Sequence, residues 1–170
     1  MRHTLAVLVE NRPGVLAHIA GLFSRRAFNI ESIAAGRTEE PDLTRITIVV
    51  DGDEQLDQVT KQLNKLVDVV GVTDFTETDS IDRELALVKV RALPGTRSDL
   101  VNIANVFRAN VVDVTREAMV LELTGDEDKI DALCEVLQDH GIIELVRTGK
   151  IALERGSRPA KADMLPPAQT

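Results

Sequence analysis

The residues best suited to binding chemistry lie near the start of this 170-residue chain. An apolar stretch runs into a loop at residues 11–14, Asn-Arg-Pro-Gly, and a helical pattern begins directly afterwards at Val15. The N–H groups at a helix N-terminus attract small anions, and Gly14 has no Cβ to keep a ligand from the backbone. Pro13 restricts the loop and adds no competing N–H. The loop is therefore a candidate site for a small carboxylate.

A second polar position follows about fifteen residues later, where Asn29 begins another strand pattern. The amides of Asn11 and Asn29 both donate and accept hydrogen bonds, which suits a zwitterion such as a free amino acid. Ile30 is placed to contact a small aliphatic side chain. The candidate site thus consists of Asn11, Pro13, Gly14, Val15, Asn29 and Ile30. The alternative is a loop that serves only as a turn and a helix cap, and the spacing alone does not separate the two.

The elements that must position these residues follow from the spacing of the apolar residues. Alternation predicts strands at residues 3–10, 29–38, 43–51 and 68–76. Helical spacing predicts one helix from Val15 and a second from Asp53, each with one apolar face. The order is β-α-β-β-α-β, which is the ferredoxin-like unit.

The same order recurs in the second half of the chain. Strands are predicted at residues 85–91, 111–115, 119–123 and 142–148, with helices after Gly95 and Gly125. The expected fold class is α+β, with two ferredoxin-like domains in tandem at residues 1–78 and 79–154. Residues 155–170 are polar and rich in Pro, so we expect a disordered tail there.

Sequence echoes indicate an internal duplication. Residues 19–23 read like residues 103–107, an offset of 84 that places Asp113 under Asn29. The second loop keeps the Pro-Gly pair at 94–95 but has no asparagine, and Asp113 would repel a carboxylate. This difference favours binding in the first half, and we expect the second half to take part in docking to a partner.

Composition and charge exclude several functional classes. The net charge of −8 argues against nucleic acid or an anionic membrane as the main partner. No apolar run approaches the ~20 residues of a membrane span, and no leader pattern is visible. The single cysteine, Cys134, fits a reducing compartment. We therefore expect a soluble cytoplasmic protein.

The chain shows no obvious catalytic or metal-binding set. Its three histidines, His3, His18 and His140, have no ligand-like spacing. The acidic runs at 51–54 and 126–128 coincide with predicted helix starts, where carboxylates act as caps. Neither a Ser-His-Asp pattern nor a phosphate loop is present. We expect a binding protein with no catalytic residues and no metal.

Several motifs together are more specific than the loop alone. In the first half these are Asn-Arg-Pro-Gly-Val-Leu from Asn11, Phe-Asn-Ile-Glu-Ser from Phe28 and Asp-Val-Val-Gly-Val from Asp68. The second half adds Arg-Glu-Leu-Ala-Leu-Val-Lys-Val from Arg83 and Val-Asp-Val-Thr from Val112. Over residues 1 to about 155 the chain resembles the regulatory small subunits of acetolactate synthase (acetohydroxyacid synthase), whose first domain is an ACT domain.

The resemblance implies a role and an assembly. Chains of this family dimerise through their ACT domains, so that Asn11 and Gly14 of one copy would face Asn29 and Ile30 of the other. The catalytic large subunit, which condenses two pyruvates, would hold thiamine diphosphate, magnesium and FAD. The small subunit would hold none of these, would raise large-subunit activity and would confer feedback inhibition by valine. Leucine and isoleucine, the other products of the pathway, are possible effectors.

A second interpretation is a free-standing tandem ACT sensor that regulates another enzyme or transcription. The two interpretations differ in partner dependence, because only a small subunit should activate an acetolactate synthase large subunit. A third, that the chain is itself an enzyme, is disfavoured by the absence of a paired acid-base or nucleophile set.

Overall fold

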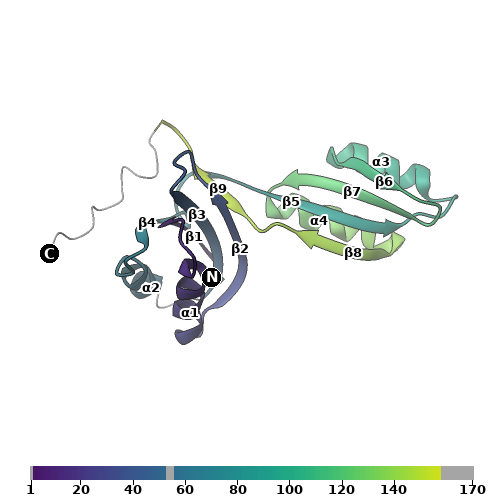
Figure 1. Cartoon of the computed structure of the whole chain (residues 1–170). Coiled ribbons are helices and arrows are strands. Elements are labelled where there is room, and N and C mark those ends of the chain that lie inside the picture. The colour runs from purple at the N-terminus through teal and green to yellow at the C-terminus, as the bar shows by residue number, and fades with distance from the viewer. Residues whose placement is uncertain (1, 53–55, 158–170) are drawn as a thin grey trace. The chain divides into compact units, whose positions relative to one another are not determined.

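The computed structural model describes residues 2–52 and 56–157, which form two compact units (Figure 1). The first unit contains the chain up to Ile81 and the segment from Lys150 onward. The second unit runs from Asp82 to Gly149. The predicted second domain, residues 79–154, includes residues 150–154, which the structure places with the first unit. The predicted tail from residue 158 lies outside the described residues.

The first unit is a four-stranded antiparallel sheet, in the order β2-β3-β1-β4, with two helices packed against it. Its elements are β1 (Arg2–Glu10), α1 (Val15–Arg25), β2 (Asn29–Arg37), β3 (Leu43–Asp51), α2 (Leu56–Leu63) and β4 (Val69–Asp74). The β-α-β-β-α-β prediction is confirmed. The predicted start of α2 at Asp53 lies outside the described residues.

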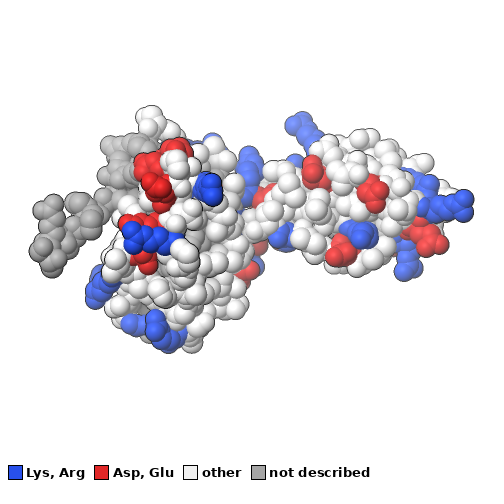
Figure 2. Space-filling view, in the orientation of Figure 1, with Lys and Arg blue, Asp and Glu red and all other residues white. Residues whose placement is uncertain are grey.

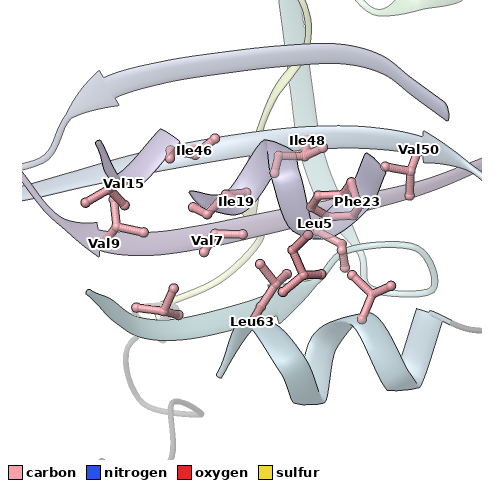
Figure 3. Close-up of a cluster of buried hydrophobic side chains, with 13 residues drawn as sticks. Leu5, Val7, Val9, Val15, Ile19, Phe23, Ile46, Ile48, Val50 and Leu63 are labelled. Atoms are coloured by element: carbon pink, nitrogen blue, oxygen red, sulfur yellow. The ribbon is translucent and has the colours of Figure 1, made fainter. Parts of the chain in front are cut away.

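The core of the first unit lies between the sheet and its helices (Figure 3). Alternate residues of the paired strands β1 and β3 point to the same side because side chains alternate along a strand. The fully buried side chains of Ile19 and Phe23 on α1 meet them. Leu16, which the apolar pattern includes, is instead 47% exposed. The strand residues in this core include Leu5, Val7, Val9, Ile46, Ile48 and Val50.

The second unit repeats the arrangement, with strands in the order β6-β7-β5-β8. Its elements are β5 (Ser80–Arg91), α3 (Arg97–Phe107), β6 (Asn110–Val114), β7 (Ala118–Gly125), α4 (Glu127–Leu137), a short 3₁₀ turn (Gln138–His140) and β8 (Ile142–Arg147). Asp126 caps α4 by accepting a hydrogen bond from the Lys129 N–H at 2.9 Å, so the predicted acidic cap is confirmed. The strand β5 begins at Ser80, five residues before the predicted start.

A cluster of ion pairs, in which Glu84 is buried and Asp131 is exposed, joins three elements of the second unit. Glu84 on β5 is 7% exposed and pairs with Arg147 at the end of β8. Arg147 also binds Asp131 on α4 at 2.6 Å. Burial by itself would lower the pKa of Arg147, but the hydrogen bonds that it donates to the carboxylates of Asp131 and Glu84, with their negative charges, outweigh burial and raise the pKa. The cluster therefore links α4 and β5 to the end of β8.

One strand is absent from the sequence-based prediction. Strand β9 (Ile151–Glu154) pairs with β5, and Ala152 packs with Ala6 and Phe75 on the sheet face opposite α1. Arg45 donates a hydrogen bond to the Ala152 carbonyl at 2.7 Å and lies over the Phe75 ring, 5.4 Å from its centroid. Four residues are too few to show an alternating pattern, so β9 is recognised only from its tertiary contacts.

Truncation tests whether β9 belongs to the first unit. We expect a chain ending at Gly149 to lose protection from hydrogen exchange at the amides of β1 and β3. The cost should be about 2 kcal/mol, because a hydrogen bond from a charged donor contributes roughly 1.5–3 kcal/mol. A chain ending at Arg155 keeps β9 and is the control. Equal protection in both chains would contradict the assignment. Deletion of residues 80–170 also removes β9, so it should lower the stability of the first unit by the same amount.

Candidate functional site

The loop at residues 11–14 presents the N-terminus of α1 at the surface. Gly14 is the N-cap, with φ 88° and ψ −13°, and no side chain caps the helix in the described part of the chain. A positive φ of this size favours glycine over any L residue. The Asn11 N–H donates to the Asp42 carbonyl at 2.8 Å and fixes the start of the loop against the β2–β3 turn. The N–H groups of the first turn of α1 have no acceptor within the helix.

Surface hollows lie on both sides of this loop. One of about 350 Å³ is lined by Asn11, Arg12 and Asp42, among others. The other, of about 250 Å³, is lined by Val15, His18 and residues 65–69. Sequence reasoning did not select Asp42 or residues 65–69, because they reach the loop only through neighbouring strands. Acidic and basic side chains are interspersed on the face of both units shown in Figure 2.

The second part of the predicted site lies at the start of β2. Asn29 is exposed and pairs with Asp51 at the end of β3. Ile30 is half-buried and packs against the core of the first unit. The register of β2 shifts between Ile30 and Ser32, so that Glu31 forms a bulge.

One copy of the chain does not bring the two parts together. Glu10, next to the loop, pairs with Leu43, whereas Asn29 pairs with Asp51 at the other end of β3. Eight residue steps of roughly 3.3 Å separate those two β3 positions, or about 26 Å. Asn11, Pro13, Gly14 and Val15 therefore form one group, and Asn29 and Ile30 form another at the opposite end of the sheet.

The structure corrects the alignment of the two halves. Ala27, with φ 58°, matches Arg108, with φ 57°, and these are the non-glycine residues with positive φ in the described chain. The bulge after Ile30 matches the bulge after Val111. Both equivalences have an offset of 81 residues, as does the Pro-Gly pair. Asn110, rather than Asp113, is therefore the local equivalent of Asn29.

The offset of 84 was wrong for a simple geometric reason. A shift of three residues is close to one helical turn of 3.6, so it preserves the apolar face of a helix while misaligning everything else. With the offset of 81, the buried Ile19 and Phe23 match the buried Leu100 and Ala104. Asp113 therefore does not occupy the position of Asn29, and its charge does not distinguish the two candidate sites.

The two loops nevertheless differ in structure. In the second unit the N-cap is Thr96, whose φ is −113°. The Arg97 guanidinium in the first turn of α3 donates to the carbonyls of Thr115 and Arg116 at 2.6 Å each. Asn110 donates to the Glu122 carboxylate at 3.3 Å. Both loops are tied to the neighbouring turn by a backbone hydrogen bond, from Asn11 to Asp42 and from Ala92 to Glu117, and the second is held by the Arg97 side chain as well.

Other candidate centres add no chemistry to the site. No group of three or more His, Cys, Asp and Glu side chains gathers for a metal ion within residues 2–52 and 56–157. Over the same residues, no helix is both long and apolar enough to cross a membrane. Burial raises the pKa of the Cys134 thiol, with a smaller opposite effect from Arg147.

Family comparisons cover both units. Residues 5–71 match a family described as the AHAS small subunit-like ACT domain, and residues 83–156 match one described as the small subunit of acetolactate synthase. The second match includes β9, although β9 packs on the first unit.

Individual relatives align over nearly the whole chain. A probable acetolactate synthase small subunit of Archaeoglobus fulgidus is 54% identical over 159 residues, covering 93% of this chain and 99% of the relative. The acetolactate synthase small subunit of Mycolicibacterium smegmatis is 50% identical over 157 residues, covering 92% of each. The crystal structure of the Thermotoga maritima small subunit superposes with a TM-score of 0.84 at 38% identity, covering 93% of this chain and 99% of that one.

A pair of glycine substitutions tests the geometry of the loop. Gly14→Ala should lower the free energy of unfolding by about 1 kcal/mol, because its φ of +88° is strained for alanine although its Cβ would meet nothing within 4 Å. Gly21→Ala, in the middle of α1 and also unobstructed, should raise it by about 0.5–1 kcal/mol. Urea unfolding at one fixed protein concentration measures both. Equal changes in the free energy of unfolding for the two variants would show that the positive φ of Gly14 is not required.

Proposed function

Because the chain belongs to the family of acetolactate synthase small subunits, we propose that it is a non-catalytic regulatory subunit of an acetolactate synthase. It activates the catalytic large subunit and makes that subunit sensitive to feedback inhibition by valine. Thiamine diphosphate, magnesium and FAD belong to the large subunit, and this chain binds the effector alone. The observation that carries the proposal is the N-terminus of α1 within an ACT-type unit, where the cap is Gly14 with a positive φ and no side chain makes a cap hydrogen bond.

The effector site is built from two copies of the chain. The two groups of site residues lie about 26 Å apart along one sheet, at roughly 3.3 Å per residue, which is too far for one small amino acid to span. Strand β2 is an edge strand, and its residues Ile33, Ala34, Ala35 and Gly36 carry no charge. Natural edge strands are normally protected by charges or proline, so an uncharged edge favours pairing with a second strand.

Antiparallel pairing of β2 with the β2 of a second copy brings the loop at residues 11–14 of one copy close to Asn29 and Ile30 of the other. Such a pair places the Asn29 end of one strand beside the Arg37 end of the other. The Arg37 end is where the loop at residues 11–14 lies, because Arg37 pairs with Thr44, next to Leu43. Each dimer therefore has two equivalent sites, each with a loop from one copy and Asn29 and Ile30 from the other.

The side of α1 near β2 would lie beside the contact between the two β2 strands, and its residues are compatible with that contact. His18 and Arg26 approach the α2 side of the unit, since Arg26 donates to the Gln58 side chain at 3.0 Å and His18 lies 4.0 Å from Asp68. The opposite side of α1 carries Leu16, which is 47% exposed, and Ala20. These uncharged side chains are suited to packing against a second copy of the helix.

The chemistry of each site suits valine. The first-turn N–H groups and the positive end of the α1 dipole bind the carboxylate. The amides of Asn11 and of the second copy's Asn29 bind the two charged ends of the zwitterion. Val15 and Ile30 provide apolar contact for the branched side chain. Valine bound across the contact between the two copies biases the arrangement of the dimer, with a coupling free energy of about 1–3 kcal/mol.

Enzyme assays test the regulatory role directly. We expect the chain to increase acetolactate formation from pyruvate by the catalytic subunit of the same organism, and valine to reverse the increase. Gly14→Asp should keep the activation and abolish the valine response, because it places a carboxylate where the effector carboxylate binds. Gly95→Asp, at the matching position of the second loop, should leave both unchanged. Absence of activation by the folded chain would instead favour a free-standing sensor.

Mixing two variants tests whether each site is shared between copies. Gly14→Asp and Asn29→Ala should each bind valine poorly as pure dimers. In a mixed dimer, one site carries both substitutions and the other carries neither. Calorimetric titration after unfolding and refolding the mixture should therefore recover about a quarter of the wild-type sites, because half of the dimers are mixed and each has one intact site. If both residues served one site within a single copy, mixing would recover none.

A further inference from the structure

The turn between α1 and β2 contains an aromatic side chain that the effector chemistry does not use. Phe28 is half-buried and packs against the core of the first unit. Its ring meets the ring of Phe23, near the end of α1 (Figure 3), edge to face, with centroids 6.3 Å apart and an interplanar angle of 89°. The Phe28 N–H also donates to the Phe23 carbonyl at 3.2 Å. Phe28 is therefore fixed to α1 through both its ring and its backbone.

The ring of Phe28 also covers a glycine at the end of β3. Asn29 pairs with Asp51 in the antiparallel ladder, so Phe28 lies opposite Gly52 one position further along. A Cβ added to Gly52 would be 2.7 Å from Phe28 Cε1 and 2.9 Å from Cδ1. The φ of Gly52 is not positive, so its backbone conformation does not itself require glycine. Glycine is needed there because the ring occupies the space of a side chain.

The second unit builds the same turn without this contact. With the offset of 81, Ala104 and Ala109 take the places of the two phenylalanines. The register of β6 with β7 places the buried Leu123 opposite Ala109. A ring thus faces a glycine in the first unit, whereas an alanine faces a leucine in the second. Because the left-handed residue and the bulge are common to both units, the backbone of the turn does not require the aromatic contact.

The asparagine that follows the turn is held differently in the two units. In the second unit the Asn110 side chain itself donates to the Glu122 carboxylate at 3.3 Å. In the first unit the Asn29 side chain is exposed, and the residues on either side of its pairing with Asp51 are held instead. Phe28 precedes Asn29 and Gly52 follows Asp51, so their contact fixes both strands at this position.

We propose that Phe28 and Gly52 are positioning residues for the effector site, which hold the backbone of Asn29 where its amide binds the effector amino acid. This rests on the proposed function, because Asn29 has a ligand only if the effector site includes it. The contact acts through Asn29 and does not itself touch the effector. It is present in the unit that carries the site and absent from the unit in which Asn110 bonds to Glu122.

Gly52→Ala tests the contact in the full chain, assayed with the catalytic subunit. The new Cβ must displace the Phe28 ring, whose other side is packed on Phe23. We expect the valine concentration for half-maximal inhibition to rise at least tenfold, while activation without valine stays within twofold of wild type. Gly125→Ala is the matched control: its Cβ would also lie 2.7 Å from a side-chain atom, but that atom is Cδ of the flexible Lys129. The control should change neither quantity more than twofold.

A compensating substitution separates positioning from a general loss of stability. Phe28→Val removes the ring atoms that the new Cβ meets, so Phe28→Val with Gly52→Ala should bring the half-inhibitory valine concentration back to within threefold of wild type. Phe28→Val alone leaves Gly52 uncovered and should raise that concentration at least threefold, which decides the matter if Gly52→Ala does not fold. An unchanged valine response in both single variants, or a parallel loss of activation and valine response, would overturn the proposal.

Hydrogen exchange reports on Asn29 whether or not valine is the effector. In Gly52→Ala, the amides of residues 29–30 that bond to β3 should exchange at least tenfold faster, while amides that join β1 to β4 keep their wild-type rates. The added Phe28→Val should restore the slower exchange. A wild-type chain without activation or valine response would contradict the proposed function, and this measurement would still decide whether the contact holds Asn29. Unchanged exchange at residues 29–30, or equal acceleration across the whole sheet, would overturn the positioning role.

Discussion

The length of α1 against the first sheet is the constraint on which the site depends. The helix runs from Gly14 at one end of the sheet to the turn before Asn29 at the other end. A helix that spans the sheet in this way separates the residue before it from the residue after it. Both positions have polar groups suited to an amino acid, yet they cannot meet within one unit. The proposed site, shared between two copies, rests on that separation together with the uncharged edge of β2.

The two units show how one backbone is used for different tasks. Their strand–loop–helix–turn–strand segments match in left-handed residues, bulges and cap hydrogen bonds at a single offset. In the first unit the N-cap of the helix is Gly14, whose φ is positive. In the second unit Arg97 ties the corresponding region to the β6–β7 turn. The duplication therefore preserves the backbone of the edge strands, while the loops before the two helices differ.

The return of the chain through β9 makes the first unit discontinuous in sequence. The chain leaves this unit after Ile81 and re-enters it at Lys150. In the returning segment, the Ala152 carbonyl accepts a hydrogen bond from Arg45, and Ala152 packs on Phe75. Phe75 lies shortly before the point where the chain leaves the first unit. Both connections to the second unit are thus anchored on the sheet face opposite α1. Arg45 on β3 contacts both connecting segments, through the Ala152 carbonyl and the Phe75 ring.

The sequence by itself determined the order of the elements, the fold class and the family. Apolar periodicity is a local property, and the loop motifs are contiguous, so both can be read without coordinates. Three features required the tertiary structure: β9, the separation of Gly14 from Asn29, and the equivalence of Asn29 with Asn110. Each depends on which residues pair across strands far apart in the chain. A helix face repeats every 3.6 residues, so helical periodicity alone could not decide between the offsets of 84 and 81 for the two halves. The left-handed residues and strand bulges decided it.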